Sequence, residues 1–131
     1  MRQDIQSRGE IEILVRTFYG KVRKHPEIGP IFNQVVDDWE SHFQTITNFW
    51  QTNLWSTKTY SNNPVQKHIA VDQEVQNQIE QAHFGFWLQL WFETVDELYE
   101  GQNAHTVKQR ARNMAGMFFM RIYQARETDP S

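Results

Sequence analysis

Two of the five histidines stand where an imidazole could do chemistry. His42 borders the apolar stripe of a helix that the sequence predicts from about Asp37 or Asp38 onward, beside Ile46. His68 follows the turn-forming start of the stretch "YSNNPVQKHIAV" and sits in a short apolar segment. An imidazole in either place can ligate a metal, exchange hydrogen bonds, or simply pack in the core with a polar partner.

A zinc centre is not expected from these residues, because the chain contains no cysteine and no HExxH motif. A haem iron makes a smaller demand on a protein. The porphyrin supplies four nitrogens, so the protein has to add only one strong ligand and a large apolar pocket. With 5 Trp, 9 Phe and 4 Tyr, the chain has the aromatic surface to line such a pocket. The residues alone leave haem ligation and a purely structural role of the histidines both open.

Helical spacing dominates the elements that must position these side chains. Apolar residues recur at three- and four-residue steps, which is typical of amphipathic helices. This spacing predicts four long helices, over residues 10–24, from 37 or 38 onward, over 73–99 and over 103–126. Gly101 is expected to end the third helix, and the "HPEIGPIF" stretch is predicted to be a turn around Gly29 and Pro30. No segment alternates with period two, so the predicted fold class is all-α.

The connection that carries His68 is long for a simple four-helix bundle, where connections are short. Something other than helix packing should therefore order the middle of the chain. The length of 131 residues fits a single domain, residues 1–131, with a core over about 10–125 and frayed tails.

Composition argues against several classes of protein. The net charge is −3 and the basic residues are scattered, so we expect no nucleic-acid partner. No apolar run reaches membrane-spanning length, and the N-terminus lacks the apolar core of a signal peptide. We therefore expect no membrane association and a cytoplasmic location, with which the lack of cysteines is compatible.

Four motifs, in order and spacing, make the chain resemble the group III truncated haemoglobins. They are "TFYGKVRKHPEIGPIFN", "DWESHFQTITNFW", "YSNNPVQKHIAV" and "HFGFWLQLW". The resemblance covers about residues 10–125. It implies a truncated globin, a two-over-two sandwich of four helices around haem b, which is a monomer or weak dimer. The short segment around His68 would then be ordered by the haem.

The resemblance also implies roles for single residues. His68 corresponds to the proximal ligand of the iron, and Tyr19, His42 and Trp87 correspond to hydrogen-bonding residues on the distal side. The remaining haem contacts would be apolar: Phe18, Phe32, Phe43, Ile46, Phe49 and Trp91.

The implied chemistry follows from the three distal donors. A diatomic ligand at a haem iron carries partial negative charge, and phenol, imidazole and indole can each donate to it. The expected ligands are O2, NO, CO or peroxide, and slow release would suit detoxification of nitric oxide or peroxide better than transport. An enzyme of this kind needs a reductase, so simple ligand binding and nitric oxide dioxygenase or peroxidase-like activity both stay open. The alternative is a haem-free helical interaction or sensor module.

One basic cluster, Lys21, Arg23 and Lys24, bears on that reductase. It is either a docking patch for an acidic redox partner or haem propionates, or simply a solvated face.

Overall fold

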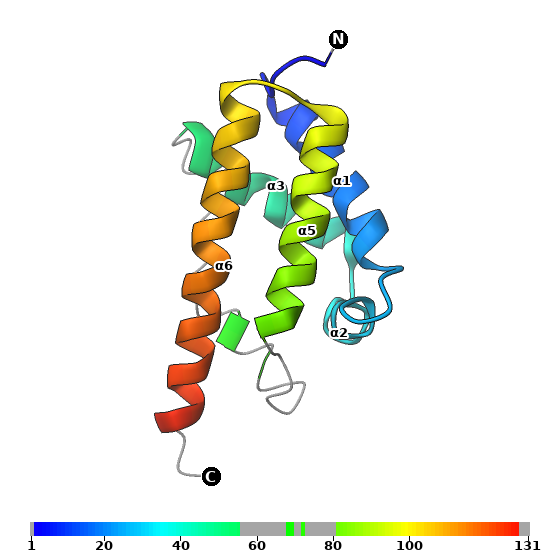
Figure 1. Cartoon of the computed structure of the whole chain (residues 1–131). Coiled ribbons are helices and arrows are strands. Elements are labelled where there is room, and N and C mark those ends of the chain that lie inside the picture. The colour runs from blue at the N-terminus through cyan, green and yellow to red at the C-terminus, as the bar shows by residue number, and fades with distance from the viewer. Residues whose placement is uncertain (1, 56–67, 70–71, 73–80, 129–131) are drawn as a thin grey trace.

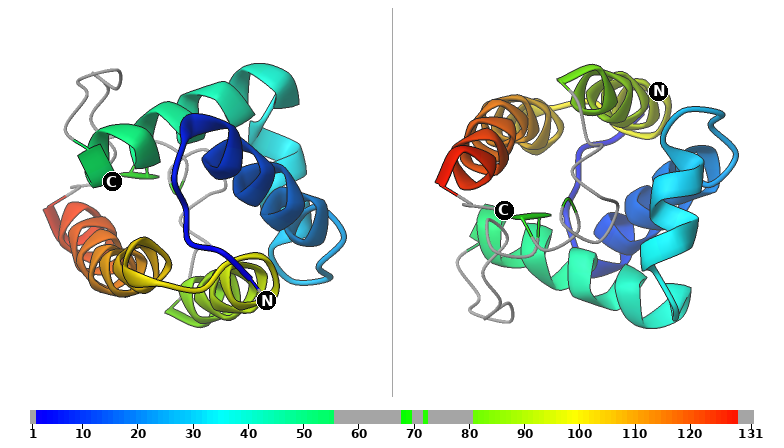
Figure 2. Two further views of the ribbon diagram at one scale, coloured as in Figure 1. Left: turned by 90° about the horizontal axis from the view of Figure 1, so that it is seen from above. Right: turned by 90° about the horizontal axis from the view of Figure 1, so that it is seen from below.

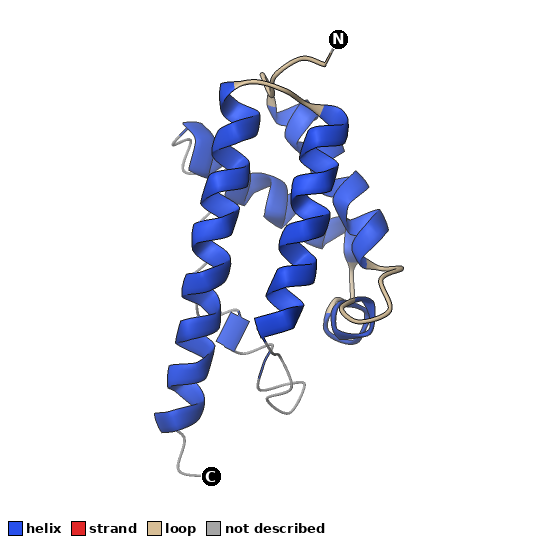
Figure 3. Ribbon diagram, in the orientation of Figure 1, coloured by secondary structure: helices blue, strands red, loops and turns tan. Residues whose placement is uncertain are grey.

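The computed structural model describes residues 2–55, 68–69, 72 and 81–128, which form helices and short connections (Figure 1). The helices are α1 (Arg8–Val22), α2 (Gly29–Val35), α3 (Trp39–Trp55), α5 (Gln81–Leu98) and α6 (Gln102–Thr128). The described residues contain no strand, as Figure 3 shows, so the predicted all-α class is confirmed. None of the described helices is both long and apolar enough to cross a membrane.

The four long helices form two layers; Figure 2 looks along α5 and α6, and α1 and α3 run across the view. One layer pairs α1 with α3, and the other pairs α5 with α6; α1 also packs on α5, and α3 on α6. The two-over-two sandwich is therefore as predicted. Apolar residues at helical spacing fill the interior because each helix buries one stripe. Those with less than 2 % exposure include Ile11, Leu14, Val15, Phe18, Trp91, Val95 and Val107.

The predicted helices agree with the observed ones where both can be compared. The first begins at Arg8 rather than at residue 10. Asp38, one of the two expected caps, accepts a hydrogen bond from the Ser41 N–H at 3.1 Å and so satisfies an otherwise unpaired donor at the start of α3. The third helix is described from Gln81, and residues 73–80 of its predicted span lie outside the described residues. Gly101, with a φ of 143°, separates α5 from α6 as expected.

The "HPEIGPIF" stretch is different from its prediction, because its second half is the helix α2. Proline is accepted in the first turn of a helix, where its missing N–H costs nothing, so Pro30 begins this helix rather than preventing it. A turn does precede it, in which His25 Nδ1 accepts the Glu27 N–H at 3.1 Å. A Cβ on Gly29 would lie 2.8 Å from the Arg23 carbonyl oxygen, so glycine lets α2 dock closely against the end of α1.

The N-terminal segment was expected to fray, but residues 4 and 5 are held in place. Ile5 is fully buried. The Asp4 carboxylate accepts the N–H groups of Asn103 at 2.9 Å and Ala104 at 2.8 Å, and so caps α6. Burial raises the pKa of Asp4, but these backbone donors outweigh it and leave the pKa below its usual value. The correction has a physical reason: the cap joins residues about a hundred positions apart, so no local pattern reveals it.

Candidate functional site

Tyr19 and His42 are the centre of an aromatic cluster between α1 and α3. The Tyr19 side chain is 3 % exposed. Its ring lies edge-on to the His42 ring at a centroid distance of 4.9 Å. Phe32 from α2 lies 5.7 Å from the Tyr19 ring, and Phe43 lies 6.0 Å from it. The structure thus brings together four residues that the sequence assigned to one pocket.

His42 carries the clearest sign of a function. Its Nε2 atom is buried and has no hydrogen-bond partner among the described residues. Burial lowers the pKa of His42 from 6.5 to about 4, and the charge of His68 contributes a smaller lowering. The imidazole is therefore neutral at pH 7, with one ring nitrogen able to donate and the other to accept. Leaving a buried polar group unpaired costs roughly 1–3 kcal/mol, so its retention calls for an explanation beyond packing.

Trp87 adjoins the same cluster through Phe18. The two rings are perpendicular with centroids 5.6 Å apart, and Phe18 also contacts Tyr19 at 4.9 Å. Trp91 lies deeper and is fully buried. It stacks on Trp50 at 5.0 Å, and its Nε1–H donates to the Val107 carbonyl at 3.1 Å. The indole N–H of Trp91 is therefore committed to joining α5 to α6, which leaves an apolar face as its contribution to a pocket.

The described aromatic neighbours of His68 are two phenyl rings. Its ring stacks on Phe118 of α6 at a centroid distance of 4.3 Å, and Phe84 of α5 lies 6.4 Å away. The expected turn at residues 61–64 lies outside the described residues.

The two other predicted contacts, Ile46 and Phe49, follow His42 along α3. Both are partly buried against the core, and Phe49 lies edge-on to Trp50 at 5.2 Å. Ile46 lies four residues and Phe49 seven residues after His42, so both lie on the same side of the helix.

Sequence reasoning missed three aromatic residues around the histidines. Trp39 lies 5.6 Å from the His42 ring and 5.7 Å from the Tyr19 ring. Phe84 and Phe118 are the neighbours of His68 described above. The sequence spacing identified Trp39 as the first apolar residue of the stripe on α3. Its contact with α1 depends on how the two helices cross, which the spacing does not predict.

The basic cluster of the sequence is largely engaged within the chain. Lys21 Nζ donates to Glu97 at 2.7 Å and to Glu93 at 3.3 Å, which ties α1 to α5. The Arg23 guanidinium lies over the Trp39 ring at 4.5 Å. Two surface hollows in the described part are lined by other residues than the cluster, one near His105 and Lys108 and one along Leu88 and Phe92.

An all-helical two-over-two sandwich that buries aromatic rings around the His42 imidazole is the architecture of a globin-type protein. No protein-family model matches the chain. The chain is 30 % identical over 128 residues to the group 3 truncated haemoglobin ctb of Campylobacter jejuni subsp. jejuni serotype O:2, covering 95 % of this chain and 97 % of that protein. The crystal structure of the group III truncated haemoglobin from Campylobacter jejuni superimposes with a TM-score of 0.82 at 30 % identity, covering 95 % of this chain and 98 % of that one. The chain therefore belongs to the group III truncated haemoglobins, a family of haem-binding globins.

Proposed function

We propose that this protein binds haem b with His68 as the protein ligand of the iron, and that Tyr19, His42 and Trp87 hold a small ligand such as O2, NO or CO. The observation that carries the proposal is the buried, unpartnered Nε2 of His42 beside the Tyr19 ring. A polar atom that a protein buries without a partner needs one from elsewhere, and a bound diatomic ligand would supply it.

The residues present fit a haem in two ways. His68 offers an imidazole that stacks on the Phe118 ring, with the Phe84 ring 6.4 Å away, and this packing suits an axial ligand. On the other side, Phe18, Phe32, Phe43 and Trp91 offer apolar surface around the polar cluster. When bound, the haem iron supplies the coordination of a diatomic ligand and one-electron redox chemistry.

The three side chains of the polar cluster differ in pKa and in the hydrogen bonds that they can form. Burial raises the pKa of Tyr19, so its hydroxyl stays protonated and able to donate at neutral pH. His42 is neutral because burial lowers its pKa. The Trp87 indole can only donate.

Three donors would retain a partly negative ligand, since each hydrogen bond contributes about 1 kcal/mol or more toward a charged acceptor. Slow release suits chemistry on the retained ligand, such as nitric oxide or peroxide detoxification, better than carriage of O2. Such turnover needs electrons from a reductase. The internal pairing of Lys21 gives the basic cluster little support as its docking surface.

The test is the absorption spectrum of the purified protein supplied with haem. We expect a strong Soret band with distinct ferrous and CO-bound forms. His68→Ala should lose or shift this band, whereas His105→Ala, an exposed histidine on α6, should leave it unchanged. Failure of the unmodified protein to take up haem would refute the proposal and favour a haem-free helical interaction module.

A further inference from the structure

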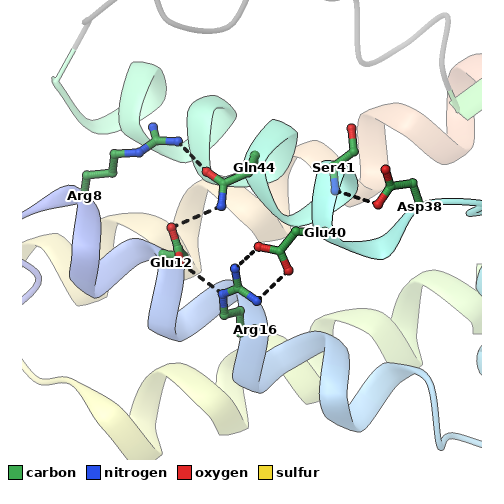
Figure 4. A network of polar contacts seen from close by, with 7 residues as sticks. All are labelled: Arg8, Glu12, Arg16, Asp38, Glu40, Ser41 and Gln44. Carbon is green, nitrogen blue, oxygen red and sulfur yellow. Dashed lines mark hydrogen bonds and ion pairs between the residues drawn. The ribbon is translucent and has the colours of Figure 1, made fainter.

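A seam of polar side chains joins α1 to α3 (Figure 4). The Arg16 guanidinium of α1 forms a two-pronged pair with the Glu40 carboxylate of α3, one prong of which measures 3.0 Å. Its Nε–H also donates to Glu12 at 3.1 Å. Gln44 of α3 donates to the other oxygen of Glu12 at 3.2 Å and accepts from Arg8 at 3.0 Å.

The seam adjoins the residues that would face a ligand. Arg16 lies one helical turn before Tyr19, and Glu40 lies two residues before His42. Phe43 connects the two sets: the guanidinium lies over its ring at 5.1 Å, and the same ring is 6.0 Å from Tyr19. A continuous series of contacts therefore leads from Arg16 to the pair of donors.

The seam is expected to contribute little to the stability of the fold. The Arg16 and Glu40 side chains are 38 % and 63 % exposed, and ion pairs at such sites contribute little to folding. Apolar packing already holds α1 against α3, but it is non-directional and permits small rotations and shifts. A planar guanidinium that grips a carboxylate with two hydrogen bonds fixes both position and orientation.

We infer that Arg16 and Glu40 are positioning residues, which hold α3 at the register and rotation that keep His42 in edge contact with Tyr19. The seam thereby sets how firmly the two donors together retain a ligand. This inference rests on the proposed function of the cluster. The hydrogen bond from Arg16 lowers the pKa of Glu40, so the pair stays ionised at neutral pH.

Two variants test the inference in the haem-loaded protein, Arg16→Met and Glu40→Gln. The readouts are the O2 dissociation rate, the C–O stretching band of the ferrous CO form and the thermal unfolding midpoint. We expect O2 to dissociate about two- to fivefold faster in each variant, because a misaligned donor loses part of a hydrogen bond. The C–O band should shift or broaden while the midpoint changes little. The double variant should match the single ones, since both remove one shared interaction.

Asp96→Asn is the matched control, because it removes an ion pair of 2.7 Å to Lys108 with similar exposure, 58 % and 24 %, between α5 and α6. It should leave rate and band unchanged. An unchanged rate and band in Glu40→Gln, while Tyr19→Phe alters both, would overturn the positioning role and leave the proposed function standing. An equal effect in Asp96→Asn would also overturn it, since general loosening would then suffice. Failure of the unmodified protein to bind haem would refute both. Should Arg16→Met not fold, Glu40→Gln alone decides.

Discussion

The surroundings of His42 and of His68 differ in kind. His42 lies among groups with polar atoms, the phenol of Tyr19 and the indole of Trp39, on helices that a polar seam joins. The described aromatic neighbours of His68 are two phenyl rings from the other layer of the sandwich, Phe118 at 4.3 Å and Phe84 at 6.4 Å. In the proposed site, the polar groups around His42 would respond to the charge of a ligand, and the phenyl rings beside His68 would hold its imidazole in place. This division suits a cofactor that is anchored on one side and reacts on the other.

The largest effect is expected when the variant that removes His68 is compared with the variant that removes His42. His68→Gly should lose or shift the Soret band of the haem-loaded protein, and free imidazole should restore it by binding in place of the missing side chain. His42→Leu should keep the band, because the polar side does not anchor the cofactor. Absorption spectra with and without added imidazole check this. A lost band in His42→Leu, with a retained band in His68→Gly, would reverse the assignment of the two sides.

The buried His42 should also make the free energy of unfolding depend on pH. Burial lowers the pKa of His42 from 6.5 to about 4. Between these values the unfolded chain binds a proton that the folded chain does not, so the free energy of unfolding falls as the pH falls. The haem-free chain should lose up to roughly 2 kcal/mol between pH 6.5 and about pH 4.5 on this account.

Denaturant unfolding at several pH values measures this slope. His42→Leu should flatten it, because the variant has no group to protonate there. His105→Leu removes an exposed histidine and should keep the slope of the unmodified chain. An identical slope in His42→Leu would show that the His42 ring is not protected from solvent.

Tyr19→Phe should speed O2 dissociation from the haem-loaded protein about tenfold, because it removes one donor toward a partly charged acceptor. Tyr123→Phe makes the same chemical change at a side chain that is 52 % exposed on α6, and should have no effect. Stopped-flow displacement of O2 by CO gives the rate. An unchanged rate would assign Tyr19 to the core rather than to the polar side.

The sequence pattern predicted the surroundings of His42 better than those of His68. Tyr19 and His42 lie on long helices whose apolar stripes are visible in the spacing, so their burial follows from local pattern. Their mutual contact does not, because it depends on how α1 crosses α3. His68 lies in a segment with little periodicity of its own, and only the resemblance to the family gave it a role.

The sequence did not predict two features of the structure, the helix α2 and the hydrogen bond of the Trp91 indole. The start of α2 looks like a turn because Gly29 and Pro30 favour turns, yet proline is equally at home at the start of a helix. The commitment of the Trp91 indole to the Val107 carbonyl could not be predicted from either stretch alone. The start of α2 is settled locally, where Gly29 packs against the Arg23 carbonyl, whereas the Trp91 bond depends on how α5 packs against α6.

The smallest effect is expected for a variant that removes a contact outside the surroundings of His42 and His68. Asp4 caps α6 at the turn after α5 through the N–H groups of Asn103 and Ala104. Asp4→Ala should lower the free energy of unfolding by about 1 kcal/mol, as the loss of a helix cap does. Asp37→Ala, at an exposed aspartate before α3, should change it less. Neither variant should move the Soret band or the O2 dissociation rate. If Asp4→Ala altered either, the polar and apolar sides would have to be coupled through α6, and the division between them would be weaker than their surroundings indicate.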